Sequence, residues 1–226
     1  MKISDKLLRR LIRIYHRTNL LYITGNYDKA LKYFEENENQ FENLPKEQQK
    51  EAEQLHCQSL MLIAIIFSYR GDLNRYFEVV IKILKIAEEI DDKYCLLLAM
   101  YGYGRYYWLS GDLIQALKYF DLAIELGQDI DDPERYMYFL SLIMMAIRVA
   151  VMKGDLEIAR EYYKQVEISE EDKNKSLLTS LNHKRMYDMS KALILKSSNR
   201  FRDRAMAQEL FKEIFEDETF LLNNRH

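Results

Sequence analysis

The chain has few of the residues that make tight turns or covalent crosslinks: 7 glycines, 2 prolines and 2 cysteines among 226 residues. So few turn formers exclude the many short connections of a β-sandwich or a barrel, and they favour helices. Cys57 and Cys95 lie inside apolar helical runs, with no sign of a secretory context. We therefore expect buried free thiols rather than a disulfide.

Long apolar runs are also missing. The longest, Leu60–Phe67, is too short to cross a bilayer. The N-terminal residues alternate basic and apolar side chains and do not form the apolar core of a targeting signal. The formal net charge of −3 argues against nucleic acid as the main partner. These absences predict a cytoplasmic protein that binds neither membranes nor nucleic acid.

No motif for catalysis or metal binding is visible in the sequence. The four histidines have no Cys, Asp or Glu at metal-ligand spacing, and no phosphate-binding loop or nucleophile elbow is present. They are His16, His56, His183 and His226. Two acidic clusters, 88–92 and 129–134, lack the central glycine and distal glutamate of a calcium loop. We predict no catalytic residues, no cofactor and no metal, and hence no enzyme.

Helical patterns fill the chain, and glycine turns interrupt them at similar intervals. Gly25, Gly71, Gly111 and Gly154 are 46, 40 and 43 residues apart. Each follows one amphipathic helical pattern and precedes the next. Hairpins repeated at a nearly fixed period indicate a solenoid, since one hairpin cannot bury its own apolar face and neighbours must stack.

The clearest repeat lies around the turn Ser110-Gly111-Asp112. Met100, Tyr103, Gly104 and Tyr107 share one face of the helix before it, and Leu113, Ala116, Phe120 and Ala123 share one face of the helix after it. The small Gly104 and Ala116 beside large residues predict that two helices approach closely there. We predict a repeat-packing set of Gly104, Tyr107, Ala116, Phe120, Ala159, Tyr163 and Ala207.

This pattern resembles the tetratricopeptide repeat family. Met100-x2-Tyr103-Gly104-x2-Tyr107 is similar to its first-helix motif and Ala116-x3-Phe120-x2-Ala123 to its second; unit two departs, with Tyr76 where a small residue is expected. The segment Lys191–Phe215 is similar to parts of long archaeal arrays. The resemblance implies an all-α, right-handed solenoid of about five antiparallel hairpins, in one domain spanning 1–226. We place the hairpins at 3–43, 46–90, 92–130, 132–168 and 170–217, with helices longer than the family's usual repeat of ~34 residues allows.

The family implies a binding module without chemistry of its own, whose concave groove is lined by the first helix of each hairpin. In the central repeat the candidate stripe is Tyr101, Arg105 and Trp108, at i, i+4 and i+7. Stepping by one repeat extends the predicted groove to Tyr15, Asn19, Tyr22, Met61, Ile65, Met144 and Arg148. An equally open alternative is that this stripe packs against the next helix pair.

Aromatic, methionine and arginine residues are typical of protein interfaces. We therefore predict a scaffold or adaptor that binds another protein or peptide, one with acidic and apolar residues; a homo-oligomer would form through the end helices. The alternative function is a ligand- or peptide-sensing regulatory domain of a signalling or transcription-control system. A basic face on the first helix, with Arg9 and Arg13 among its cations, is interpreted as the solvated side of an end helix.

Overall fold

The computed structural model describes residues 5–42, 49–128, 133–166 and 181–216. The chain forms two compact units: unit 1 reaches to Tyr106, and unit 2 runs from Tyr107 to Arg225. Every regular element in the described ranges is a helix, which confirms the all-α prediction. The hairpin ends predicted at 3, 43, 46, 130, 132, 168, 170 and 217 lie outside the described residues.

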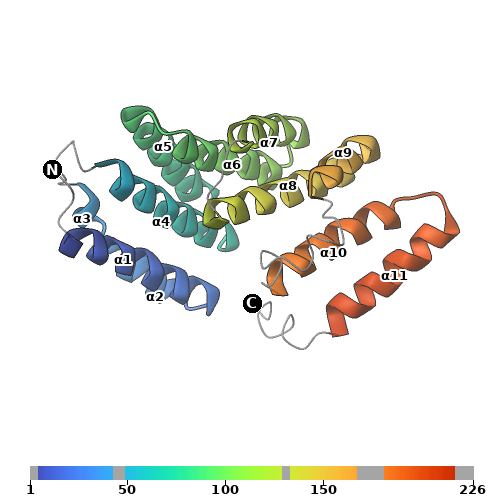
Figure 1. Cartoon of the computed structure of the whole chain (residues 1–226), viewed down its shortest axis with the longest axis horizontal. Coiled ribbons are helices and arrows are strands. Elements are labelled where there is room, and N and C mark those ends of the chain that lie inside the picture. The colour runs from blue at the N-terminus through green and yellow to red at the C-terminus, as the bar shows by residue number, and fades with distance from the viewer. Residues whose placement is uncertain (1–4, 43–48, 129–132, 167–180, 217–226) are drawn as a thin grey trace. The chain divides into compact units, whose positions relative to one another are not determined.

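The helices follow one another in simple hairpin order (Figure 1). Unit 1 holds α1 (Asp5–Ile23), α2 (Tyr27–Glu35), α3 (Asn39–Glu42), α4 (Gln49–Tyr69) and α5 (Leu73–Ile90), and α6 (Lys93–Ser110) begins in it. Unit 2 holds α7 (Leu113–Gly127), α8 (Pro133–Lys153), α9 (Leu156–Val166), α10 (Leu181–Lys196) and α11 (Phe201–Glu216). The helices α4 and α8 have 21 residues each, in line with the long repeat period.

The four predicted glycine turns are confirmed by their backbone conformation. Gly25, Gly71, Gly111 and Gly154 have φ values of 70, 72, 89 and 91°, a region that side chains with a Cβ rarely adopt. After each glycine, the next N–H bonds back to a carbonyl five residues earlier, for example Asp72 N–H to Phe67 O at 3.0 Å. This bond closes the helix end in a Schellman motif. The turn chemistry therefore repeats with the sequence period.

Aspartates start the helices that follow two of these turns. The Asp72 carboxylate accepts the Arg75 N–H at 3.1 Å, and the Asp112 carboxylate accepts the Gln115 N–H at 3.0 Å. These bonds satisfy amide groups that have no partner inside the helix. The sequence Gly-Asp thus encodes both the end of one helix and the start of the next.

Asp92 caps α6 from a buried position. Its carboxylate accepts the Cys95 N–H at 3.0 Å and the Gln54 side-chain amide at 2.7 Å, and Lys50 lies 3.3 Å away. Burial would raise the pKa of Asp92, but these hydrogen bonds outweigh burial and the pKa is lowered. The cap therefore links the start of α6 to α4.

Asp92→Ala is expected to destabilise unit 1 by about 1–2 kcal/mol, because the Cys95 N–H and the Gln54 amide lose their acceptor. Urea unfolding followed by far-UV circular dichroism measures the change. The matched control is the preceding Asp91→Gly, at an exposed residue with a φ of 48°. Glycine adopts this φ without strain, so the control should not destabilise the protein. Equal losses from both changes would contradict the capping role.

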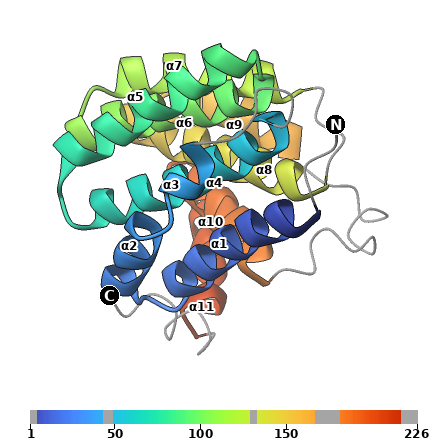
Figure 2. The same ribbon diagram turned by 90° about the vertical axis from the view of Figure 1, so that its left-hand side faces the viewer.

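The helix α4 is the centre of unit 1. It packs on α1, α2, α3 and α5 and lies between the α1–α2 hairpin and α5 in both ribbon views (Figures 1 and 2). Because it is covered on several sides, its apolar residues are buried nearly all round instead of along one stripe. They include Cys57, Leu60, Met61, Leu62, Ile63, Ala64, Ile66 and Phe67. Cys57 and Cys95 are both buried and free, as predicted.

A glycine on α6 makes room for α5. A Cβ placed on Gly102 would lie 2.7 and 2.9 Å from the two methyl groups of Val80 and 3.3 Å from the Met61 methyl. Beside this contact the fully buried Tyr76 of α5 donates its hydroxyl to the Gly102 carbonyl at 2.9 Å. The departure from the repeat pattern at Tyr76 therefore has a physical reason: the large side chain lies on α5 and the small one on α6.

The helix α8 has the same central place in unit 2. It packs on α7, α9 and α10, and α10 packs on α11. Its buried residues in the described part include Phe139, Leu140, Leu142, Ile143, Met144, Met145, Ala146, Ile147, Val149 and Ala150. Two covered helices, α4 and α8, thus each organise the core of one unit.

The residues of the repeat-packing set are mostly buried. Ala116, Phe120 and Ala159 are fully buried, and Ala207 is 2% exposed; Gly104 is buried too. The two tyrosines of the set are half-buried and stack on other tyrosines: Tyr107 on Tyr119 at 5.3 Å, and Tyr163 on Tyr187 at 5.1 Å. The close approach predicted at Gly104 stays a prediction.

Candidate functional site

Tyrosines from three helices gather in unit 1, near the ends of α1 and α4. The rings of Tyr22 and Tyr69 stack with centroids 6.4 Å apart and planes within 4°, and their hydroxyls are 3.4 Å apart. Tyr27, at the start of α2, lies 5.7 Å from the Tyr69 ring. Tyr22 and Tyr69 occupy similar places, shortly before the turn glycines of their repeats, so the repeat itself brings them together.

Arg105 of α6 lies against these rings and is 9% exposed. Its guanidinium carbon is 5.9 Å from the centre of the Tyr69 ring, and its Nη2 donates to the Ser68 hydroxyl at 3.3 Å. It is also hydrogen-bonded to Tyr101, one turn earlier on α6. We call Tyr22, Tyr27, Tyr69, Tyr101 and Arg105 the tyrosine–arginine cluster.

Two groups of the cluster, Tyr22 and Arg105, have raised pKa values. Burial raises the pKa of Tyr22, and the Tyr69 hydroxyl raises it further although Arg105 opposes this. Burial would lower the pKa of Arg105, but the surrounding tyrosines, Tyr101 first among them, outweigh burial and raise it. Arg105 therefore keeps its positive charge at neutral pH, and Tyr22, with its raised pKa, is poorly suited to act as a general base.

The predicted groove residues of unit 1 divide into three groups: those in the cluster, those in the core and those that are half-buried. Tyr22, Tyr101 and Arg105 interact electrostatically with one another, so the structure brings these three together. Tyr15 and Met61 are 8% and 1% exposed, and Met61 contacts the Gly102 backbone region, so both contribute to the core. Asn19 and Ile65 are half-buried.

In unit 2 the indole N–H of Trp108 donates to the Met152 sulfur at 3.3 Å. Trp108 and Arg148 are half-buried, Met144 is 3% exposed, and Met152 is 61% exposed. Arg105 belongs to unit 1 and Arg148 to unit 2. The prediction that both arginines project into one concavity stays a prediction.

Sequence reasoning missed Tyr27, Tyr69 and Met152. Tyr69 follows Ser68, a position reached by stepping the stripe back one repeat, and Met152 lies one turn after Arg148. The signal that could have found Tyr69 and Met152 is an aromatic or sulfur side chain next to a stripe position at the end of a first helix; Tyr27, at the start of α2, carries no such signal. A search restricted to i, i+4 and i+7 passes over that signal.

A second polar cluster surrounds the buried His56 of α4. The Nδ1 of His56 is 3.1 Å from the Glu53 carboxylate and its Nε2 is 3.5 Å from Glu38, which also pairs with Lys82 at 2.8 Å. Its ring stacks on Phe41 with centroids 4.7 Å apart. The hydrogen bond to His56 and the Lys82 ammonium lower the pKa of Glu38 to about 2, although burial opposes them. These charges connect the segment after α2 to α4 and α5.

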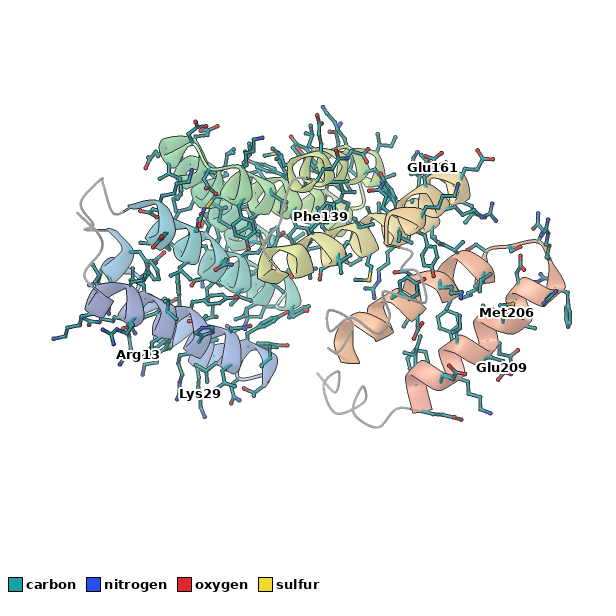
Figure 3. All side chains as sticks on the ribbon, viewed as in Figure 1. Arg13, Lys29, Phe139, Glu161, Met206 and Glu209 are labelled. Carbon is teal, nitrogen blue, oxygen red and sulfur yellow. The ribbon has the colours of Figure 1, made fainter. Side chains whose placement is uncertain are left out.

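The basic face of α1 is exposed, as expected for an end helix. Its cations are Lys6, Arg9, Arg10, Arg13 and Arg17. Arg13 on α1 and Lys29 on α2 are labelled in Figure 3. Arg9 and Arg13 on this exposed face are therefore suitable positions for control substitutions.

In the described part of the chain, no group of three or more His, Cys, Asp and Glu side chains could hold a metal ion. None of the helices in the described ranges combines the length and apolar character that a membrane crossing requires.

Comparison with known proteins gives matches among solved structures. No protein-family model matches the chain, and no curated protein matches it either. A crystal structure of a kinesin-light-chain-type protein of Podosopora anserina, with nearly identical TPR-like repeats, is 15% identical, with a TM-score of 0.57 over 92% of this chain and 94% of that one. A crystal structure of a substituted form of that protein is 16% identical with the same TM-score, over 94% and 96% of the two chains. The chain thus has a TPR-like helical-repeat fold, the fold that the sequence resemblance implied.

Proposed function

We propose that this protein is a non-enzymatic scaffold or adaptor that binds an extended or helical segment of another protein at the tyrosine–arginine cluster. TPR-like repeats generally mediate protein–protein interaction, through the surfaces that stacked repeats create. In unit 1 the cluster joins residues of α1, α2, α4 and α6, so a ligand at this place contacts several repeats at once. A cytoplasmic location stays a prediction.

The observation that carries the proposal is the environment of Arg105. The groups around its guanidinium in the described part of the chain include hydroxyls of Ser68, Tyr101, Tyr69 and Tyr76. The planar guanidinium suits a carboxylate, because it donates two parallel hydrogen bonds. The site therefore favours an acidic side chain.

The ring of Tyr69 adds apolar contact next to that charge. It is 56% exposed and stacked on Tyr22, so it offers a face held in place by its neighbour. Tyrosine and arginine are common among the residues that dominate interface energies. The favoured partner therefore carries an acidic residue beside an apolar one. Nucleic acid is disfavoured, because a polyanion needs many more cations than this cluster holds.

The test begins with a partner isolated by pull-down and measured by titration calorimetry. Tyr69→Ala is expected to weaken binding about tenfold or more, as the loss of an interface anchor does, with unchanged far-UV circular dichroism because Tyr69 is largely exposed. Arg105→Lys keeps the positive charge but removes the planar guanidinium that donates two parallel hydrogen bonds, so it should also weaken binding. Arg148→Ala tests separately whether unit 2 takes part.

Arg9→Ala with Arg13→Ala is the matched control on α1, and it should leave the affinity unchanged. Loss of binding in this control alone would move the site to the basic face of α1. Loss of helicity in Arg105→Lys would show that this arginine is structural. In that case the affinity of Tyr69→Ala decides whether the cluster binds the partner.

A further inference from the structure

The outer face of α11, in unit 2, is largely exposed in the described part of the chain. Its residues, together with Lys191 of α10, line a shallow hollow of about 470 Å³, in which Met206 is 43% exposed. Met206 and Glu209, one turn apart on α11, are labelled in Figure 3. The inner face of the same helix packs on α10, and it buries Ala207 and Ile214. The outer face is therefore a second apolar surface on a helix already packed on one side.

The charge of this face changes sign from one end of the helix to the other. Arg202, Met206, Glu209 and Glu213 follow one another at helical spacings of four, three and four residues, so they lie in one row. Ala205 and Leu210 flank the row on its two sides. The row begins with the cation Arg202, continues with the apolar Met206 and ends with the anions Glu209 and Glu213.

We propose that this face binds a second copy of the chain, with the two α11 helices antiparallel about a two-fold axis between Ala207 and Gln208. In this arrangement Arg202 of each copy faces Glu213 of the other. Met206 of each copy lies beside Leu210 of the other, because both residues are on the same side of the row. A two-fold contact repeats each pair, so every favourable pair occurs twice. This inference uses residues other than those of the tyrosine–arginine cluster and does not depend on it.

The order of charges selects the antiparallel arrangement. A parallel pair would place Arg202 on Arg202 and Glu213 on Glu213, and such like-charge contacts oppose association. The small Ala205 leaves space beside the row for the second helix. The contact area of one helix pair is small beside a standard interface, so the association is expected to depend on protein concentration.

Sedimentation velocity on the whole chain, over a series of concentrations, tests the proposal. The wild-type protein should pass from monomer to dimer as its concentration rises, and added salt should shift the balance towards monomer. Arg202→Glu and Glu213→Arg should each raise the dissociation constant roughly a hundredfold, because each change creates two like-charge contacts in the dimer.

Charge exchange provides the decisive comparison. The double variant Arg202→Glu with Glu213→Arg should dimerise again, and an equal mixture of the two single variants should form a mixed dimer. Arg204→Glu, exposed on another side of α11, is the matched control and should dimerise like the wild type. A monomer at every concentration, equal weakening by the control, or no recovery on charge exchange would each overturn the proposal.

Discussion

Gly102→Ala is expected to destabilise unit 1 by about 1–3 kcal/mol, although alanine is the better helix former. The added Cβ would lie 2.7 Å from one Val80 methyl and 2.9 Å from the other, far inside the ~3.5–4.0 Å at which carbon atoms attract. Both methyls are branches of one stiff side chain, so turning one away brings the other closer. The clash exceeds the gain of up to about 1 kcal/mol from helix propensity.

A double-mutant cycle identifies the contact. Val80→Ala alone should destabilise the protein by leaving a cavity. Combined with Gly102→Ala, it removes the methyls that clash, so the double variant should be more stable than the sum of the two changes predicts. Urea unfolding of all four proteins gives the coupling energy. Additive effects would contradict a close approach of α5 and α6 at this position.

Local signals made most of the fold predictable from the sequence. The turn at Gly71-Asp72 needs a positive φ and a capping carboxylate, and both requirements appear as residue types at fixed spacing. The close contact at Gly102 was not predicted, because the family pattern draws attention to Gly104 instead. Which residue of α6 faces α5 depends on the rotation of α6, and packing over long sequence distances sets that rotation.

The candidate site was only partly predictable, for the same reason. The predicted stripe includes Tyr22, Tyr101 and Arg105, which interact with one another in the structure; whether they form a binding site stays a prediction. The same stripe included Met61, which is buried. Periodicity places a residue on a face of its helix, but the depth of that face depends on neighbouring helices. The contact between His56 and Glu38 was not predictable, because Glu38 comes from the preceding hairpin.

Replacing His56 with glutamine is expected to destabilise unit 1 by about 3–5 kcal/mol, the usual cost of removing one partner from a buried ion pair. Both ring nitrogens face carboxylates, at 3.1 Å to Glu53 and 3.5 Å to Glu38, so both donate only in the charged imidazolium. Glu53 is 9% exposed and would keep a buried charge without this cation. Lys82 would still pair with Glu38, so most of the cost arises at Glu53.

The contacts of His56 with Glu53 and Glu38 should also make the stability of unit 1 depend on pH. Burial, and to a smaller extent Lys82, would lower the pKa of His56, but the hydrogen bonds to Glu38 and Glu53 outweigh them and the pKa is raised above 6.5. A folded-state pKa above the unfolded value stabilises the protein fully below pH ~6.5, and this contribution is lost as the pH rises through the raised pKa. One proton limits the slope to about 1.4 kcal/mol per pH unit.

Urea unfolding at a series of pH values from slightly acidic to alkaline measures this slope, and proton NMR of the His56 ring gives its pKa directly. His56→Gln should remove the decrease in stability above neutral pH. Glu53→Gln should keep the histidine and lower its pKa, because it takes away one acceptor of the imidazolium. A His56 pKa at or below 6.5, or a pH slope unchanged in His56→Gln, would show that the two carboxylates do not hold the charged ring. If the slope disappears in His56→Gln and moves to lower pH in Glu53→Gln, the connection between α4 and the segment after α2 depends on this imidazolium.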